Sequence, residues 1–329
     1  MSAERIVRWG VMGAGAIAGK VTPQIAAAPT SRLRAVASRD GSRAEAFAKE
    51  HGAERAYGSY DDLLADPDVD AVYIATPNGL HGEHAIAAAR AGKHVLCEKP
   101  MAATAGEVEE IFNAAEEAGV VMMEAFMYRF HPLMREVLRR VRDGEIGCVG
   151  LIRSSFCFDI GDKPENIRLS RGLQGGAIMD IGCYCVNFSR AVTGEEPDRV
   201  SASAYVGTYG VDEWTSGVLG FPGGAVASFS AAVRCAATSE AQIYGSAGMI
   251  DIPKPWLASE PQVAFTLKRK GEKEGETVVV SSPHNRYYCQ TEAFNAAVLD
   301  GAPLLLTRDD ALGNARVIER LHEAIGVKW

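Results

Sequence analysis

The sequence predicts two domains of different class. An α/β domain with a doubly wound parallel sheet is expected over residues 1–125, and an α+β domain with a large open, mostly antiparallel sheet over 126–329. Three observations lead to this. The chain has 329 residues, more than one ordinary hydrophobic core supports. Before residue 125 short apolar runs alternate with Ala-rich helical segments. After it, strand-like runs follow one another with few helices between them.

In the first domain, helical segments at 82–92 and 104–119 separate some of the expected strands. The strands are apolar runs rich in Val, Ile and Ala, at 6–12, 33–38, 71–76, 94–99 and 120–125. This alternation is typical of βαβ units, whose right-handed crossovers bring the carboxyl ends of the strands to one edge of the sheet. Ligands of such sheets bind at that edge.

The second domain is expected to begin with a helix at 131–144. A further helix starts near Gly175-Gly176 and runs through "AIMDIGCYCVNFSRAVTG", and a last amphipathic helix at 308–325 can pack back on the first domain. Turn signals such as "FPGG" and "GSAG" separate the expected strands. These strands lie near 148–159, 200–208, 214–221, 224–235, 240–246 and 263–281.

Composition excludes several classes of protein. A formal net charge of −8 argues against general nucleic-acid binding, which needs a basic face. No apolar run approaches the ~18 residues of a membrane span, and the start "MSAERIVRWG" lacks the apolar core of a signal peptide. Seven cysteines without a C-x-x-C pattern suggest neither a disulfide framework nor a zinc ribbon. We expect reduced thiols, no metal and a cytoplasmic location.

A glycine-rich turn follows the first expected strand. The segment Gly13-Ala14-Gly15-Ala16-Ile17-Ala18 has the form G-x-G-x-x-A and opens a helix. The glycines permit a tight turn and close approach of the backbone to a pyrophosphate, which the helix N-terminus stabilises. Because the turn joins the first strand to the first helix, it predicts a dinucleotide-binding Rossmann domain with contacts from Gly13, Gly15, Ala16 and Ile17.

The end of the second strand indicates which dinucleotide binds. An NAD-binding domain usually has an acid there, for the ribose 2′-hydroxyl, but this chain has Ser38-Arg39, with Arg43 one helical turn later. A hydroxyl with guanidinium groups suits a 2′-phosphate. Asp40 is expected to cap the next helix. The sequence therefore favours NADP(H) over NAD(H).

Two further strands end in polar residues at the same predicted edge. Thr76-Pro77-Asn78 follows the strand at 71–76, with His81 close behind, and Glu98-Lys99 ends the strand at 94–99. All are candidate cofactor contacts, although a histidine at this position can also simply begin a helix. Lys99 is expected at the nicotinamide end of the groove. A buried lysine is costly to desolvate unless its charge has a use.

The helix that starts near Gly175 carries Asp180 and Tyr184, whose spacing of four residues puts them on one helical face. Near a lysine they would form a proton-transfer set, since an adjacent ammonium favours the phenolate. A buried hydrogen bond between the two explains the spacing equally well. Cys183 and Cys185 project in different directions, so a metal is not expected there.

These motifs together resemble the Gfo/Idh/MocA family of nicotinamide-dependent oxidoreductases over nearly the whole chain. The resemblance rests on "GVMGAGAIA", "TPNGLHGEHAIAAARAGKHVLCEKPMA", "MEAFMYRFHP" and "GGAIMDIGCYCVNFSR", in the family's order. The chain is most similar to the branch that holds dihydrodiol dehydrogenase, glucose–fructose oxidoreductase and sugar-ketone reductases. That branch has tyrosine at the position of Tyr184.

The resemblance implies residue roles. Lys99, before a proline in a cis peptide, would orient the substrate hydroxyl and lower the pKa of Tyr184. Tyr184 would be the general acid/base, and Asp180 would fix the substrate or the tyrosine. Arg129 and Arg168 are candidate substrate or nicotinamide contacts, with a surface or structural role as likely for each.

The expected activity is therefore hydride transfer between NADP(H) and a secondary alcohol or ketone of a sugar, polyol or cyclic diol. One alternative is an oxidoreductase that keeps its cofactor and couples two sugars. Another is an NADP-sensing regulator without catalysis, which the presence of all three catalytic candidates disfavours. The open sheet is expected to form a homodimer or homotetramer, since broad exposed faces usually bury against a partner.

Overall fold

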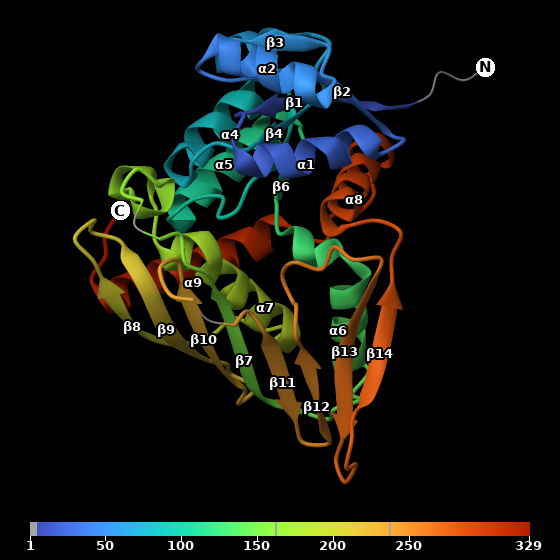
Figure 1. Ribbon diagram of the computed structural model, residues 1–329, viewed down its shortest axis with the longest axis vertical. Helices are drawn as coiled ribbons and strands as arrows, with labels where there is room; N and C mark the ends of the chain where they lie inside the picture. Colours follow the sequence, from blue (N-terminus) through green and yellow to red (C-terminus); the bar gives the residue numbers. More distant parts are fainter. Residues whose placement is uncertain (1–4, 162, 237) are drawn as a thin grey trace. The chain divides into compact units, whose positions relative to one another are not determined.

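The computed structural model describes residues 5–161, 163–236 and 238–329 (Figure 1). It divides into two compact units. Unit 1 comprises Met1–Met127 with Tyr287–Leu312, and unit 2 comprises Tyr128–Arg286 with Gly313–Trp329. The segment Tyr287–Leu312, which the sequence analysis grouped with the second domain, thus belongs to unit 1. Among the described residues, no helix combines the length and the apolar character that a membrane span requires.

Unit 1 is built on a six-stranded parallel sheet of order β3-β2-β1-β4-β5-β6, which confirms the predicted doubly wound domain. The chain order reverses beside β1, where such folds bind ligands. The strand β3 was not predicted because it has three half-buried residues and no apolar run. The strands are β1 Val7–Met12, β2 Ser31–Ala37, β3 Arg55–Tyr57, β4 Ala71–Ile74, β5 His94–Cys97 and β6 Met122–Glu124.

Local signals explain where the helices of unit 1 begin and end. Asp40 caps α2, as predicted, by accepting a hydrogen bond from the amide of Arg43 at 3.2 Å. Thr104 and Glu107 form a capping box at α5, and Gly119 ends it at φ 66°. The helices are α1 Ala16–Ala27, α2 Gly41–His51, α3 Tyr60–Ala65, α4 His81–Arg90 and α5 Ala105–Ala118, with the short 3₁₀ helix η1 Asn78–Leu80.

A helix that the sequence analysis missed, α8 (Arg286–Asp300), also packs in unit 1. The indole of Trp9 donates to Asn295 at 3.1 Å, and the rings of Trp9 and Phe294 lie 5.2 Å apart. Both partners are fully buried. This contact joins residues almost 300 positions apart, so no local pattern could predict it.

Unit 2 contains an eight-stranded sheet of order β14-β13-β12-β11-β7-β10-β9-β8, in which only the β7–β10 pair is parallel. The predicted open, mostly antiparallel sheet is confirmed. The run at 263–281 forms two strands, and β12 was not predicted. The strands are β7 Val149–Cys157, β8 Arg199–Val206, β9 Asp212–Gly220, β10 Val226–Ala232, β11 Ala241–Gly245, β12 Gly248–Ile252, β13 Gln262–Arg269 and β14 Glu276–Ser281.

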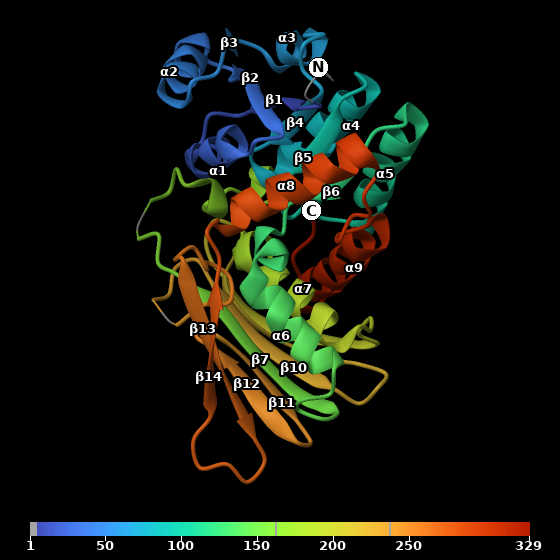
Figure 2. The same cartoon turned by 90° about the vertical axis from the view of Figure 1, so that its right-hand side faces the viewer.

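Helices cover one face of this sheet (Figure 2). They are α6 (Pro132–Arg142), which packs on β13 and β14, and α7 (Cys183–Thr193), which packs on β7 and β10. The helix α9 (Arg308–Ile325) closes the chain, as predicted. The opposite face of the sheet carries exposed residues in alternation along β9, beginning with Trp214.

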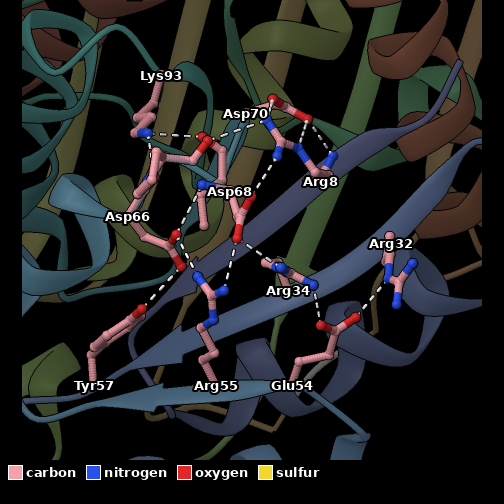
Figure 3. Close-up of polar contacts among 12 residues, drawn as sticks. Arg8, Arg32, Arg34, Glu54, Arg55, Tyr57, Asp66, Asp68, Asp70 and Lys93 are labelled. Atoms are coloured by element: carbon pink, nitrogen blue, oxygen red, sulfur yellow. Dashed lines mark hydrogen bonds and ion pairs between the residues drawn. The ribbon is translucent and has the colours of Figure 1, made fainter.

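Charged residues tie together the amino edge of the unit 1 sheet, opposite the edge where ligands are expected (Figure 3). Asp68 pairs with Arg8 at 3.0 Å, Arg34 at 2.8 Å and Arg55 at 2.7 Å. Arg55 also pairs with Asp66 at 2.7 Å, and Arg8 with Asp70 at 2.6 Å. We call these six residues the amino-edge network. It links the starts of strands β1, β3 and β4.

Candidate active site

The glycine-rich turn between β1 and α1 has the backbone that the motif predicts. Gly13 adopts φ +103°, and a Cβ there would lie 2.8 Å from the carbonyl oxygen of Ala75. Gly15 precedes α1 with no side-chain cap, and a Cβ built on it meets nothing within 4 Å. Ala16 is exposed and Ile17 half-buried in the first turn of α1. The turn can thus receive a phosphate against open backbone.

The three candidate residues after β2 differ in their contacts and exposure. Arg43 is bound to the glycine-rich turn, because its Nε and Nη2 donate to the carbonyl oxygen of Ala14 at 3.0 and 2.8 Å. Ser38 is buried, and its Oγ accepts from the amide of Asp40 at 3.3 Å. Arg39 is exposed. Its guanidinium is therefore the group on this segment best able to bind a ligand.

The segment after β4 turns sharply into η1. Thr76 is buried, with its Oγ1 3.0 Å from Nδ1 of His84, and Pro77 precedes η1 at φ −60°. Asn78 begins η1 and is half-buried. His84 was not a candidate in the sequence analysis. Only its place one turn into α4 brings it to Thr76.

The segment after β5 carries Lys99, which is half-buried, and the Lys99–Pro100 peptide is cis, as the resemblance predicted. Glu98 is buried and turned inward. Its carboxylate accepts from the hydroxyl of Tyr73 at 2.6 Å and from the amide of Lys99 at 3.3 Å. The carboxylate of Glu98 therefore supports the Lys99 segment from within the protein.

His81 is the first residue of α4, and its ring is almost completely buried. Its Nδ1 lies 2.8 Å from the carbonyl oxygen of Pro100, and its Nε2 lies 2.8 Å from that of Thr76. Burial lowers the pKa of His81 to about 4, partly opposed by these two carbonyls and reinforced by the charge of Lys99. Both ring nitrogens thus face the protein, and the ring is neutral at physiological pH.

Glu124, at the end of β6, was not among the predicted site residues. It is buried, and its Oε1 accepts from the amide of Met101 at 2.8 Å. A carboxylate that ends an apolar strand is the same sequence signal that singled out Glu98, so this residue could have been found.

In unit 2, Asp180 and Tyr184 lie where a π-helical turn, η5 (Ile178–Gly182), passes into α7. The Nε of Arg168 donates to Oδ2 of Asp180 at 2.5 Å, and its guanidinium lies 5.3 Å from the centre of the Phe158 ring. π-Helical turns are uncommon and often occur at functional sites.

Tyr184 is buried among aromatic rings. Its ring centre lies 5.3 Å from that of Phe156, 5.7 Å from Tyr128 and 6.0 Å from Trp256. Such surroundings exclude water, which strengthens electrostatic interactions at the phenol.

Two further polar groups support the helix of Tyr184. Arg129 is buried, and its Nη1 donates to Oδ1 of Asn187 in α7 at 3.1 Å. Asp212, which the sequence analysis missed, accepts from the amide of Ile178 at 2.8 Å and from the hydroxyl of Thr215 at 2.7 Å. Burial raises the pKa of Asp212 to about 6, and these hydrogen bonds oppose the rise.

In the part of the chain that the structure describes, no cluster of His, Cys, Asp or Glu could hold a metal ion.

Two family models match the chain. "Oxidoreductase family, NAD-binding Rossmann fold" matches residues 7–126, and "GFO/IDH/MocA C-terminal domain" matches residues 134–251. The chain belongs to the GFO/IDH/MocA family of oxidoreductases, as its motifs predicted.

Individual relatives agree with this assignment. D-xylose 1-dehydrogenase (NADP(+)) 2 of Haloferax volcanii is 38% identical over 96% of both chains. Trans-1,2-dihydrobenzene-1,2-diol dehydrogenase of Mus musculus is 37% identical over 77% of both. Among solved structures, the 3-ketoreductase KijD10 of Actinomadura kijaniata, in complex with NADP and TDP-benzene, matches with a TM-score of 0.91. It is 29% identical over 97% of this chain and 98% of that one.

Proposed function

We propose that the protein is an NADP(H)-dependent oxidoreductase that transfers a hydride between the nicotinamide and a secondary alcohol or ketone. The substrate is a sugar, a polyol or a cyclic diol. The observation that carries the proposal is a half-buried lysine, Lys99, at the edge of the sheet that also holds the Gly13–Gly15 turn. Relatives named for xylose and dihydrodiol oxidation and for ketone reduction support the substrate class.

The preference for NADP(H) is supported by the exposed guanidinium of Arg39 beside the buried hydroxyl of Ser38. NAD-binding domains usually have an acid at this position. Here a guanidinium and a hydroxyl are available instead, and both can interact favourably with a 2′-phosphate. Arg43 holds the glycine-rich turn through Ala14 and adds positive charge. When bound, NADP(H) supplies or accepts the hydride.

Side chains of the protein transfer the proton that accompanies the hydride. In this proposal Tyr184 gives its phenolic proton to the carbonyl oxygen during reduction and takes it back during oxidation. The ammonium of Lys99 orients the substrate oxygen and favours the phenolate that forms transiently. Asp180, neutralised in part by Arg168, orients the substrate or the tyrosine. These roles rest on the family resemblance and on the buried setting of Tyr184.

Nucleotide absorbance on purified, dialysed protein tests the proposal, with NADP⁺ and NAD⁺ in parallel against aldoses, inositols, anhydro-sugars and trans-dihydrodiols. Reduction of NADP⁺ by one group of substrates supports the proposal and defines the substrate class. Bound nucleotide that survives dialysis and is reduced by one sugar and reoxidised by another would instead identify an enzyme that couples two sugars. Tight NADPH binding without turnover on any substrate, in either direction, would favour an NADP-sensing regulator without catalysis.

We also propose that the uncovered face of the eight-stranded sheet joins copies of the chain in a homodimer or homotetramer. Tyr205 and Trp214 stack there at 4.4 Å and are 48% and 42% exposed, with Val218 44% exposed on the same face. Apolar groups gathered on a broad face favour burial against a partner. Light scattering should show an oligomer that Trp214→Glu weakens and Leu305→Glu, in an exposed apolar position of unit 1, leaves intact. A wild-type monomer would disprove this.

A further inference from the structure

We propose that His81 and Glu124 are positioning residues that hold the segment Lys99–Met101 and thereby aim the ammonium of Lys99. The inference rests on the proposed function, since it gives these two buried side chains a role only if Lys99 acts on the substrate. Neither residue needs to touch substrate or cofactor. Their contribution passes through the backbone of the lysine segment.

Three consecutive residues of this segment are each held through their backbone by a different side chain. The amide of Lys99 donates to Glu98, the carbonyl oxygen of Pro100 lies 2.8 Å from His81, and the amide of Met101 donates to Glu124 at 2.8 Å. The three side chains come from the residue that follows β5, the start of α4 and the end of β6. The backbone that carries Lys99 is thus fixed from three neighbouring elements.

The ring of His81 also joins two strand exits. Its other nitrogen lies 2.8 Å from the carbonyl oxygen of Thr76, in the segment after β4. The ring therefore lies between the exit of β4 and the exit of β5, in contact with a carbonyl oxygen of each. Burial is the main cause of the low pKa of this ring, and the positive charge of Lys99 adds to it.

A neutral imidazole has one N–H and can donate to only one of these two carbonyls. For His81 to hold the lysine segment, this proton must lie on Nδ1, because an unprotonated nitrogen cannot donate to the carbonyl oxygen of Pro100. Glu124 needs only an acceptor oxygen to hold the amide of Met101.

Matched substitutions separate the two contacts of His81. In the His81→Asn variant the side-chain amide nitrogen can take the place of Nδ1. In the His81→Gln variant the side-chain amide nitrogen can take the place of Nε2. Because His81→Gln removes the contact with Pro100, it should lower kcat by about tenfold, less than the ~10²-fold that misplacing a reacting group by about 1 Å can cost, since Glu98 and Glu124 still hold the segment. His81→Asn should retain more of the turnover. In the same way Glu124→Gln, which keeps an acceptor, should retain more than Glu124→Leu. The dissociation constant of NADPH should change far less than kcat, because both ring nitrogens of His81, a candidate cofactor contact in the sequence analysis, contact backbone carbonyls.

A double-mutant cycle shows whether the effect passes through Lys99. We would follow the nicotinamide absorbance in a single turnover, with the one of the aldoses, inositols, anhydro-sugars and trans-dihydrodiols that reduces NADP⁺ fastest. His81→Gln should slow the wild-type enzyme but add little to the loss caused by Lys99→Met, because residues that act as one unit are not additive. Melting temperatures identify variants that fail to fold.

The possible outcomes distinguish a failure of the positioning role from a failure of the proposed function. Equal losses from His81→Gln in the wild-type and Lys99→Met backgrounds would overturn the inference, as would equal turnover in the Asn and Gln variants of His81. If Lys99→Met itself keeps full turnover, the proposed function fails at the lysine. That result is distinct from a failure of the positioning role.

Discussion

Gly176 and Asp212 are in direct contact at the start of the helix that carries Tyr184. A Cβ on Gly176 would clash with Oδ1 of Asp212, while Oδ2 accepts from the amide of Ile178 at 2.8 Å. Gly176 also adopts φ +107°, which side chains rarely tolerate. The glycine thus lets a buried carboxylate reach the first turn of this helix.

Gly176→Ala should therefore destabilise the protein by at least about 2 kcal/mol, because it combines a clash with an unfavourable backbone conformation. Chemical denaturation measures the loss. Gly172→Ala is the matched control, since a Cβ there meets nothing within 4 Å and its φ is not positive. Equal stability of the two variants would contradict the role assigned to Asp212.

The catalytic assignment predicts large losses of turnover. Lys99→Met and Tyr184→Phe should each lower kcat by at least ~10²-fold, the usual contribution of acid–base assistance, and should leave NADPH binding largely unchanged. Lys49→Met and Tyr209→Phe, of the same residue types elsewhere, serve as controls. Near-full turnover of Tyr184→Phe would show that another group moves the proton.

Cofactor selectivity depends on Arg39 in our proposal. Arg39→Ala should weaken NADPH binding by tenfold or more, about 1.4 kcal/mol, and NADH binding far less, because only NADPH carries the 2′-phosphate. Fluorescence titration with both nucleotides measures this. Arg90→Ala, which removes an exposed arginine at the end of α4, controls for general loss of positive charge. Equal weakening of both nucleotides would remove the case for phosphate recognition.

The amino-edge network predicts a loss of stability in acid. Hydrogen bonds from Arg34 and Arg55 lower the pKa of Asp68 to about 2, below its usual value of 3.8. A carboxylate with a lowered folded-state pKa stabilises the protein above the unfolded value, and this contribution disappears as the pH falls through the folded value. The stability difference between wild type and Asp68→Asn should therefore shrink between about pH 4 and pH 2. Urea denaturation at several pH values measures it, and a constant difference would contradict the assignment.

Much of the first domain could be predicted because its signals are local. Apolar runs alternating with helical segments define parallel strands, and right-handed crossovers bring their carboxyl ends together. Gly13, Thr76 and Lys99 were therefore expected at one edge before any contact was known. The family motifs then identified Tyr184 and Asp180 as candidates, although their pairing with Lys99 stays a prediction.

The sequence by itself determined the class of both domains, the glycine-rich turn and the lysine after β5, since each depends on residue type and spacing along a short stretch. Only the tertiary structure decided that His81 lies on Pro100, that Glu124 holds Met101 and that Asp212 holds Ile178. These pairs are 19 to 34 residues apart in the chain. Buried polar groups must find partners wherever packing brings them, and packing depends on the whole chain.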